Sequence, residues 1–215
     1  MIPSIEGKLG KRRQAGKSCH WHDFGIALTG PVPLSDRWQN SKITLMSILY
    51  FAYGSNMSTG RMRYRVENFR FRGVAQLPKH GLRFHKRSVD GSAKCNALFT
   101  GILSDTVFGV VYELPPSEKS ILDRAEGLGR GYHEERLRVL LPNGDELDIC
   151  TYIADPTAID DGLKPYSWYK EFVLAGADEH QLPPEYVDSH IRAVPTIADP
   201  DRTRERKRRA EVKLT

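Results

Sequence analysis

The chain has 215 residues, of which 40% are hydrophobic and 27% charged, and its formal net charge is +5. This length suits one globular domain with flanking segments and leaves little room for a second full domain. No run approaches the ~18 consecutive apolar residues of a membrane-spanning helix, and no apolar stretch typical of a secretory signal follows the basic N-terminal residues. Three cysteines without a C-x-x-C pair do not form a disulfide framework, so we expect a cytoplasmic protein.

The positive charge lies at the two ends of the chain. Residues 1–45 carry seven Lys or Arg against three Asp or Glu, residues 199–215 carry seven against four, and residues 46–198 carry 18 against 20. We predict a slightly acidic domain at 46–198, preceded by a disordered or mis-assigned extension at 1–45 that ends before Met46. The segment 199–215 has mixed charge signs and few apolar residues, which predicts a disordered tail or a solvated helix. Nucleic-acid binding through these basic flanks is a secondary alternative.

The first regular element is an apolar and aromatic run at 48–53, which is typical of a buried strand, closed by the turn residues 54–56. Helical periodicity follows at 58–66. Short strands rich in β-branched and aromatic residues are then predicted at 71–77, 81–86, 97–103 and 107–114.

The second half of the domain alternates differently. A helix is predicted at 116–126, and two strands, 133–141 and 146–154, flank an Asn-Gly turn that strongly indicates a hairpin. Two further helices are predicted at 167–175 and 184–191. About seven strands and four helices predict an α+β fold with a mainly antiparallel sheet, curled or closed into a barrel that protects its edges.

Two segments could carry chemistry. Backbone N–H groups of the strand–turn–helix junction around Asn56 and Ser58 could bind carboxylate or phosphate oxygens, although a simple capped helix gives the same pattern. Glu126 lies in the last helical turn before Gly127, where the helix dipole disfavours an ionised carboxylate by roughly 0.3–1 kcal/mol. Such a carboxylate suits general acid–base catalysis, and the alternative is an exposed Glu at a frayed helix end.

Other catalytic patterns are weaker. Cys95 and His85 could form a nucleophile pair, but nothing in the sequence orients His85. The chain contains no P-loop, no G-x-G-x-x-G and no G-x-S-x-G pattern, so the commonest nucleotide-binding and hydrolase motifs are excluded.

Two motifs in order resemble those of the γ-glutamylcyclotransferase family. They are Tyr53-Gly54-Ser55-Asn56-Met57, directly after a strand, and Asp123-Arg124-Ala125-Glu126-Gly127, about seventy residues later. Segments at 84–95, 108–112 and 169–183 are similar to the family in the same order. The resemblance extends over about 46–195 and is greatest to the bacterial-type branch that carries Tyr-Gly-Ser-Asn.

The resemblance implies a γ-glutamylcyclotransferase-like fold and an acyltransferase or lyase of glutathione metabolism. Such an enzyme cyclises γ-glutamyl amino acids or amines to 5-oxoproline by intramolecular aminolysis, without a metal or cofactor. The resemblance also implies that Glu126 is the general base and acid. The residues implied to contact substrate are Tyr50, Phe51, Ala52, Tyr53, Gly54, Ser55, Asn56, Tyr132 and Tyr169.

Two further expectations follow from this resemblance. A catalytically inactive or specialised small-molecule-binding member of the same fold is the alternative function. The expected partner is a small γ-glutamyl compound, with no membrane partner, and a homodimer is compatible with the domain size.

Overall fold

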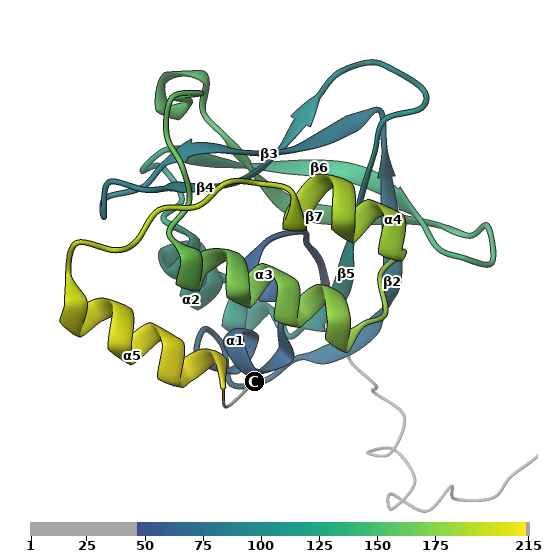
Figure 1. Cartoon of the computed structure of the whole chain (residues 1–215). Helices are drawn as coiled ribbons and strands as arrows, with labels where there is room; N and C mark the ends of the chain where they lie inside the picture. Colours follow the sequence, from purple (N-terminus) through teal and green to yellow (C-terminus); the bar gives the residue numbers. More distant parts are fainter. Residues whose placement is uncertain (1–46, 214–215) are drawn as a thin grey trace, which may run out of the picture. The chain divides into compact units, whose positions relative to one another are not determined.

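The computed structural model describes residues 47–213, so the interpretation of residues 1–45 concerns a segment outside the described residues (Figure 1). Five strands form a closed barrel in the order β1-β5-β2-β6-β7. Their bounds are β1 (Ile48–Ala52), β2 (Arg70–Pro78), β5 (Thr106–Leu114), β6 (Tyr132–Leu140) and β7 (Glu146–Ala154). Four neighbouring pairs are antiparallel, and a parallel pairing of β1 with β7 closes the barrel. The predicted α+β fold with a mainly antiparallel closed sheet is confirmed.

Local turn chemistry explains the hairpin between β6 and β7. Their register runs from Tyr132 opposite Ala154 to Leu140 opposite Glu146. Gly144 in the connecting turn has φ of 89°, in the left-handed region that glycine adopts without strain. The Asn-Gly signal therefore predicted this hairpin correctly.

Two strands form a separate two-stranded sheet outside the barrel, namely β3 (His80–Arg87) and β4 (Ala93–Phe99). Lys86 of β3 also forms an isolated antiparallel bridge with Ile159. The sequence predicted β4 at 97–103, which is several residues too late. A tight turn with Gly91 at φ of 83° lets β4 start at Ala93, and Gly101 at φ of 72° follows its end.

Helices cover part of the barrel. They are α1 (Thr59–Arg63), α2 (Pro116–Glu126), α3 (Ser167–Glu179), α4 (Pro184–Val187) and α5 (Arg202–Val212), with shorter helical turns η2 (Ser55–Met57), η3 (Pro156–Ala158) and η4 (Asp188–Arg192). In Figure 1, α3 crosses in front of the barrel strands, and α5 lies beside α3. None of the helices within residues 47–213 is long and apolar enough to cross a membrane.

The packing of α3 positions the turn that follows β1. A Cβ added at Gly176 of α3 would lie 2.4 Å from the backbone nitrogen of Ser58 and 2.6 Å from the carbonyl carbon of Met57. Real Cβ atoms do not approach backbone this closely. Gly176 therefore allows α3 to lie directly against the chain between η2 and α1.

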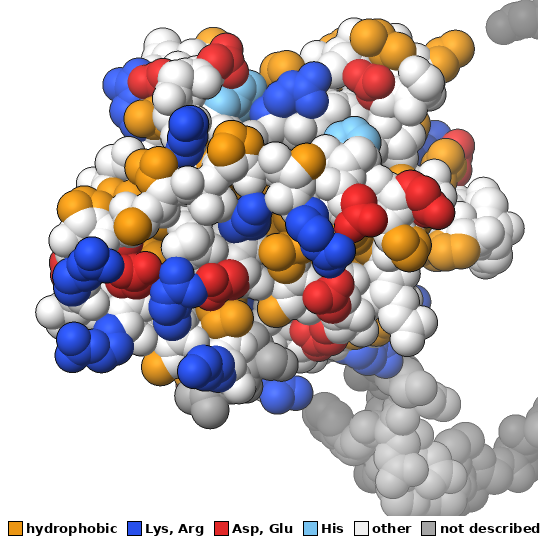
Figure 2. Space-filling model, in the orientation of Figure 1, with side chains coloured by type: hydrophobic (Ala, Val, Ile, Leu, Met, Phe, Trp, Pro, Cys, Tyr) orange, Lys and Arg blue, Asp and Glu red, His pale blue; other side chains and the backbone are white. Residues whose placement is uncertain are grey.

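Residues 202–212 form the helix α5, so of the two alternatives given for this segment, a disordered tail or a solvated helix, the structure has a helix that contacts the domain. Asp201 caps α5 by accepting from the N–H groups of Thr203 and Arg204, each at 3.0 Å. Asp199 is 1% exposed, accepts from the indole N–H of Trp168 at 2.9 Å and pairs with Arg204 at 2.5 Å. Figure 2 shows Lys and Arg side chains gathered over α5 with acidic side chains among them. Arg209 of α5 forms an ion pair with Glu171 of α3 and donates to the hydroxyl of Ser167 at 2.8 Å. These contacts are polar, so hydrophobic periodicity could not predict the docking of α5.

Candidate active site

The turn after β1 places polar residues, Asn56 among them, in the wall of a pocket. The N–H of Met57 donates to the carbonyl of Gly54 at 3.0 Å, which forms the helical turn η2. The hydroxyl of Ser58 accepts from the N–H of Arg61 at 3.2 Å and caps α1. Since Ser58 is the cap, the side chain of Asn56 is available for other contacts.

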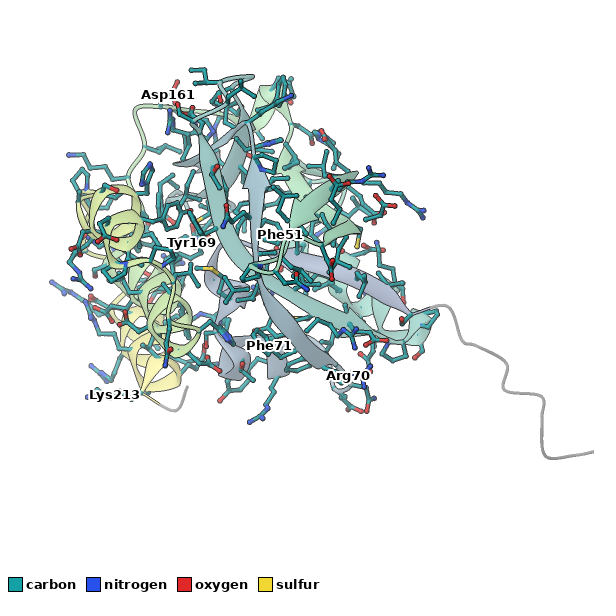
Figure 3. The ribbon with its side chains drawn as sticks, turned by 90° about the vertical axis from the view of Figure 1, so that its right-hand side faces the viewer. Phe51, Arg70, Phe71, Asp161, Tyr169 and Lys213 are labelled. Carbon is teal, nitrogen blue, oxygen red and sulfur yellow. The ribbon has the colours of Figure 1, made fainter. Side chains whose placement is uncertain are left out.

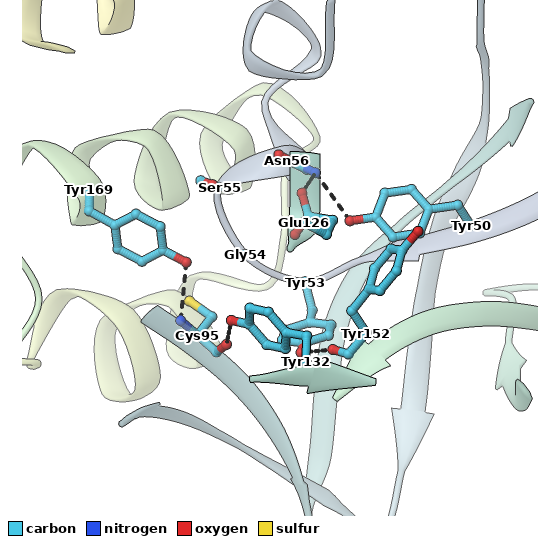
Figure 4. A pocket seen from close by; sticks show the side chains of 10 residues that line it. All are labelled: Tyr50, Tyr53, Gly54, Ser55, Asn56, Cys95, Glu126, Tyr132, Tyr152 and Tyr169. Carbon is cyan, nitrogen blue, oxygen red and sulfur yellow. Dashed lines mark hydrogen bonds between the residues drawn. The ribbon is translucent and has the colours of Figure 1, made fainter. Parts of the chain in front are cut away.

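Asn56 contacts the carboxylate that the sequence singled out. Its amide nitrogen donates to Oε1 of Glu126 at 2.7 Å and to the hydroxyl of Tyr50 at 3.2 Å (Figure 4). The amide oxygen of Asn56 is buried and has no hydrogen-bond partner among the described residues. α2 ends in a left-handed residue, Gly127, with φ of 72°, and Glu126 is half-buried just before it. Glu126 is therefore a positioned carboxylate rather than an exposed side chain at a frayed end.

These residues line a small polar pocket. The cavity among these side chains is narrow, with a volume of about 40 Å³. Eight of the residues implied by the resemblance lie in its wall, and two further residues complete it. The lining residues are Tyr50, Tyr53, Gly54, Ser55, Asn56, Cys95, Glu126, Tyr132, Tyr152 and Tyr169.

Two residues expected at the site lie elsewhere. Phe51 is fully buried and Ala52 is 1% exposed, and both belong to the hydrophobic core rather than to the pocket wall. Figure 3 shows Phe51 among the barrel strands, while Tyr169 lies toward the helices. Successive side chains of a strand point to opposite faces, so Phe51 faces away from Tyr50 and Ala52. A contact of Phe51 or Ala52 with substrate stays a prediction.

Cys95 and Tyr152 were missed as pocket residues. Tyr169 accepts from the backbone N–H of Cys95 at 3.1 Å, and Tyr132 donates to the carbonyl of Cys95 at 2.5 Å. Tyr53 donates to the carbonyl of Tyr152, whose own hydroxyl donates to Asp123 of α2 at 2.7 Å. Tyrosine hydroxyls thus tie β4 and β7 to the site. In the alternating strand β7, Tyr152 shares one face with the residues two positions before and after it, and this was a weak signal for its location.

The thiol of Cys95 is not prepared for nucleophilic attack. Burial raises the pKa of this thiol to about 12, so it is protonated at neutral pH. His85 is engaged elsewhere, because its Nδ1 lies 2.7 Å from Asp161 and its Nε2 lies 3.0 Å from the side-chain amide of Asn96. The possible Cys–His pair is therefore not formed.

The tyrosines of the pocket are hydrogen-bonding groups rather than bases. Burial raises the pKa of Tyr50, Tyr132 and Tyr169 well above the usual value, and for Tyr50 the charge of Glu126 adds to the effect. They therefore remain neutral at physiological pH. Among the lining residues, Glu126 is the one carboxylate, and it is the group that can accept a proton there. Within residues 47–213, no three His, Cys, Asp or Glu side chains are grouped so that they could hold a metal ion.

The chain is similar to one family model and to individual known proteins. The model of the AIG2-like family matches residues 106–189. Gamma-glutamylcyclotransferase of Homo sapiens is 32% identical over 144 residues, which cover 65% of this chain and 75% of the human protein. The Bos taurus protein of the same name is 33% identical over the same length and coverage.

Solved structures are also similar. A structure of a gamma-glutamyl cyclotransferase superposes with a TM-score of 0.70 at 26% identity and covers 79% of this chain and 99% of that one. An uncharacterized Homo sapiens protein superposes with a TM-score of 0.64 at 29% identity and covers 70% and 89% of the two chains.

Proposed function

Since the chain belongs to the AIG2-like, γ-glutamylcyclotransferase family, we propose that it cyclises γ-glutamyl amino acids or γ-glutamyl amines to 5-oxoproline. The observation that carries this proposal is the hydrogen bond between Asn56 and Glu126 inside a pocket lined by the Tyr-Gly-Ser-Asn turn. We further propose that the enzyme is of the bacterial type that carries this turn.

The reaction needs proton transfer and a folded substrate. The α-ammonium of the γ-glutamyl group gives a proton to Glu126, and the freed nitrogen attacks the γ-carbonyl carbon. A C–N bond forms in the five-membered ring, and the bond between that carbon and the leaving amine breaks. Glu126 returns the proton to the departing nitrogen, and the ring nitrogen gives up a second proton, which also passes to the leaving amine. The products are therefore 5-oxoproline, with one hydrogen on its ring nitrogen, and a free amine in its ammonium form. Because nucleophile and electrophile belong to one molecule, holding them in the correct geometry supplies much of the acceleration.

The surroundings of Glu126 suit this role. Asn56 belongs to the pocket wall, and its amide oxygen is buried without a partner. We assign to this oxygen a hydrogen bond from a second N–H of the α-ammonium, which would hold the nitrogen between Asn56 and Glu126. Backbone N–H groups of the turn at Gly54 and Ser55 are the groups we assign to the substrate carboxylate or the developing oxyanion. The rings of Tyr132 and Tyr169, whose hydroxyls contact the backbone of Cys95, are the pocket walls to which we assign the exclusion of water.

A panel of γ-glutamyl compounds tests this proposal. The full-length protein is incubated with γ-glutamyl-alanine, other γ-glutamyl amino acids and γ-glutamyl amines, and 5-oxoproline is measured by mass. We expect 5-oxoproline and an equal amount of free amine from at least one compound. Binding in a thermal-shift measurement without product from any compound would favour the non-catalytic binding member instead.

A further inference from the structure

A second, larger pocket adjoins the candidate active site. Its cavity volume is about 430 Å³, and it shares with the first pocket the wall formed by Ser55, Glu126, Tyr132 and Tyr169. A γ-glutamyl group bound in the first pocket would place its γ-carbonyl near Glu126, at the boundary between the two. The leaving amine would then extend into the second pocket, whose chemistry decides which amines fit.

The wall of this second pocket is strongly basic. It contains six cationic side chains, and its carboxylates are Asp90 and the shared Glu126. The six cations are Arg61, Arg65, Lys86, Lys94, Arg204 and Arg208.

Four of these cations already have carboxylate partners. Arg61 and Arg208 both pair with Glu211, at 3.3 and 2.8 Å. Lys94 pairs with Asp90 at 2.9 Å. Arg204 pairs with the buried Asp199, which holds α5 in place. These ion pairs stabilise the fold around the pocket. They also neutralise the four cations, so these side chains have little charge left to bind a ligand.

Lys86 and Arg65 have no ion-pair partner among residues 47–213. Lys86 is 6% exposed, and its ammonium lies 4.5 Å from the centroid of the Tyr132 ring. Burial lowers the pKa of Lys86, and the charges of Glu126, Asp90 and Asp155 act in the opposite direction without forming an ion pair with it. The guanidinium of Arg65 donates to the carbonyl of Ala125 at 2.9 Å, and its buried Nε has no hydrogen-bond partner.

Lys86 is buried and Arg65 is half-buried, and a cation that is withdrawn from water without an ion-pair partner is costly. An anionic ligand would compensate both charges. We propose that this second pocket binds the leaving amine, and that Lys86 and Arg65 make the enzyme prefer leaving groups that are acidic amino acids. An ordinary amino acid offers one carboxylate, whereas an acidic amino acid offers two, which matches two uncommitted cations. This inference rests on the proposed function of the first pocket.

Two substrates of equal size test the preference. γ-Glutamyl-glutamate and γ-glutamyl-glutamine differ in one charged group of the leaving amino acid. For the full-length protein we expect kcat/KM to be at least about tenfold higher for the acidic compound, the factor of one charge-assisted hydrogen bond. Lys86→Met should bring the ratio close to one, and Lys86→Arg, which retains the charge, should keep most of it.

The matched control is Arg87→Gln. Arg87 follows Lys86 on β3, its side chain is 57% exposed, and it is outside both pockets. This variant should retain the wild-type ratio. Equal kcat/KM for the two compounds in the wild type, or a ratio that Lys86→Met leaves unchanged, would overturn the proposal while leaving the cyclisation itself intact.

Binding separates failure of this inference from failure of the proposed function. Calorimetry is carried out with both compounds on the Glu126→Gln protein. Suppose that γ-glutamyl-glutamate binds more tightly and that the wild type releases no 5-oxoproline from any compound. This outcome would support the anion-binding subsite and contradict the proposed cyclisation. Equal affinities, or binding of neither compound, would overturn the subsite.

Discussion

The side-chain amide of Asn56 donates a hydrogen bond of 2.7 Å to Oε1 of Glu126, although 70 positions separate the two residues in the chain. This bond joins the turn after β1 to the last turn of α2. The dipole of α2 disfavours a carboxylate at its C-terminal end, and a hydrogen bond to the charged form compensates for part of that cost. The same amide also contacts Tyr50, so one side chain orients two walls of the pocket.

Removing the amide should therefore reduce turnover more than stability. In Asn56→Ala we expect kcat to fall by about a hundredfold, because displacement of a reacting group by about 1 Å has effects of this size. The midpoint of thermal unfolding should change little, since the variant also removes a buried carbonyl without a partner. Steady-state kinetics and thermal unfolding measure both effects. Asn143→Ala, in the exposed β6–β7 turn, is the control, and an unchanged kcat in Asn56→Ala would contradict the role assigned to this contact.

The close approach of α3 gives a prediction in which two effects have opposite signs. Helix propensity alone predicts that Gly176→Ala stabilises a helix by about 1 kcal/mol. The added Cβ would instead lie 2.4 Å from the backbone nitrogen of Ser58, so we expect a net loss of about 1–3 kcal/mol and a lower kcat/KM as the turn shifts. Chemical denaturation measures the free energy of unfolding. A more stable Gly176→Ala protein would show that α3 does not press on this turn.

Docking of α5 should depend on pH. The hydrogen bond from Arg204 lowers the pKa of Asp199 from its ordinary value of 3.8 to about 2. A carboxyl whose pKa is lower in the folded state contributes stability that is complete above the unfolded pKa and is lost as the pH falls through the folded pKa. The free energy of unfolding should therefore decrease between about pH 4 and pH 2.

Asp199→Asn separates this contribution from other carboxyl groups. We expect the variant to be less stable at pH 6 and to lose less stability than the wild type between about pH 4 and pH 2. Urea unfolding at each pH measures the difference. Identical pH dependence of the two proteins would exclude Asp199 as the acid-sensitive contact.

Features set by local chemistry could be predicted from the sequence. The Asn143–Gly144 turn indicated the β6–β7 hairpin, and Gly127 marked the end of α2 because a left-handed residue is required there. The run before Gly54 was correctly predicted as a buried strand. Resemblance to a family, rather than spacing, is what suggested that Asn56 and Glu126 belong to one site.

Features that depend on distant contacts could not be predicted. α5 buries charged groups against α3, so its sequence shows no apolar face that would reveal the contact. Cys95 contributes to the pocket through its backbone, which two distant tyrosines contact, and its identity as cysteine carries no signal for that. The uncommitted state of Lys86 depends on which carboxylates the fold places near the other cations.

The central claim is that Glu126 transfers the proton during cyclisation, and Glu126→Gln tests it most directly. The side chain keeps its size and can still contact Asn56, but it cannot accept the α-ammonium proton. The measurement is the rate of 5-oxoproline release from γ-glutamyl-alanine by the wild type and the variant, together with their unfolding midpoints and substrate affinities. We predict a folded protein that binds the substrate and has lost several orders of magnitude in kcat. Release of 5-oxoproline by Glu126→Gln at the wild-type rate would contradict the account.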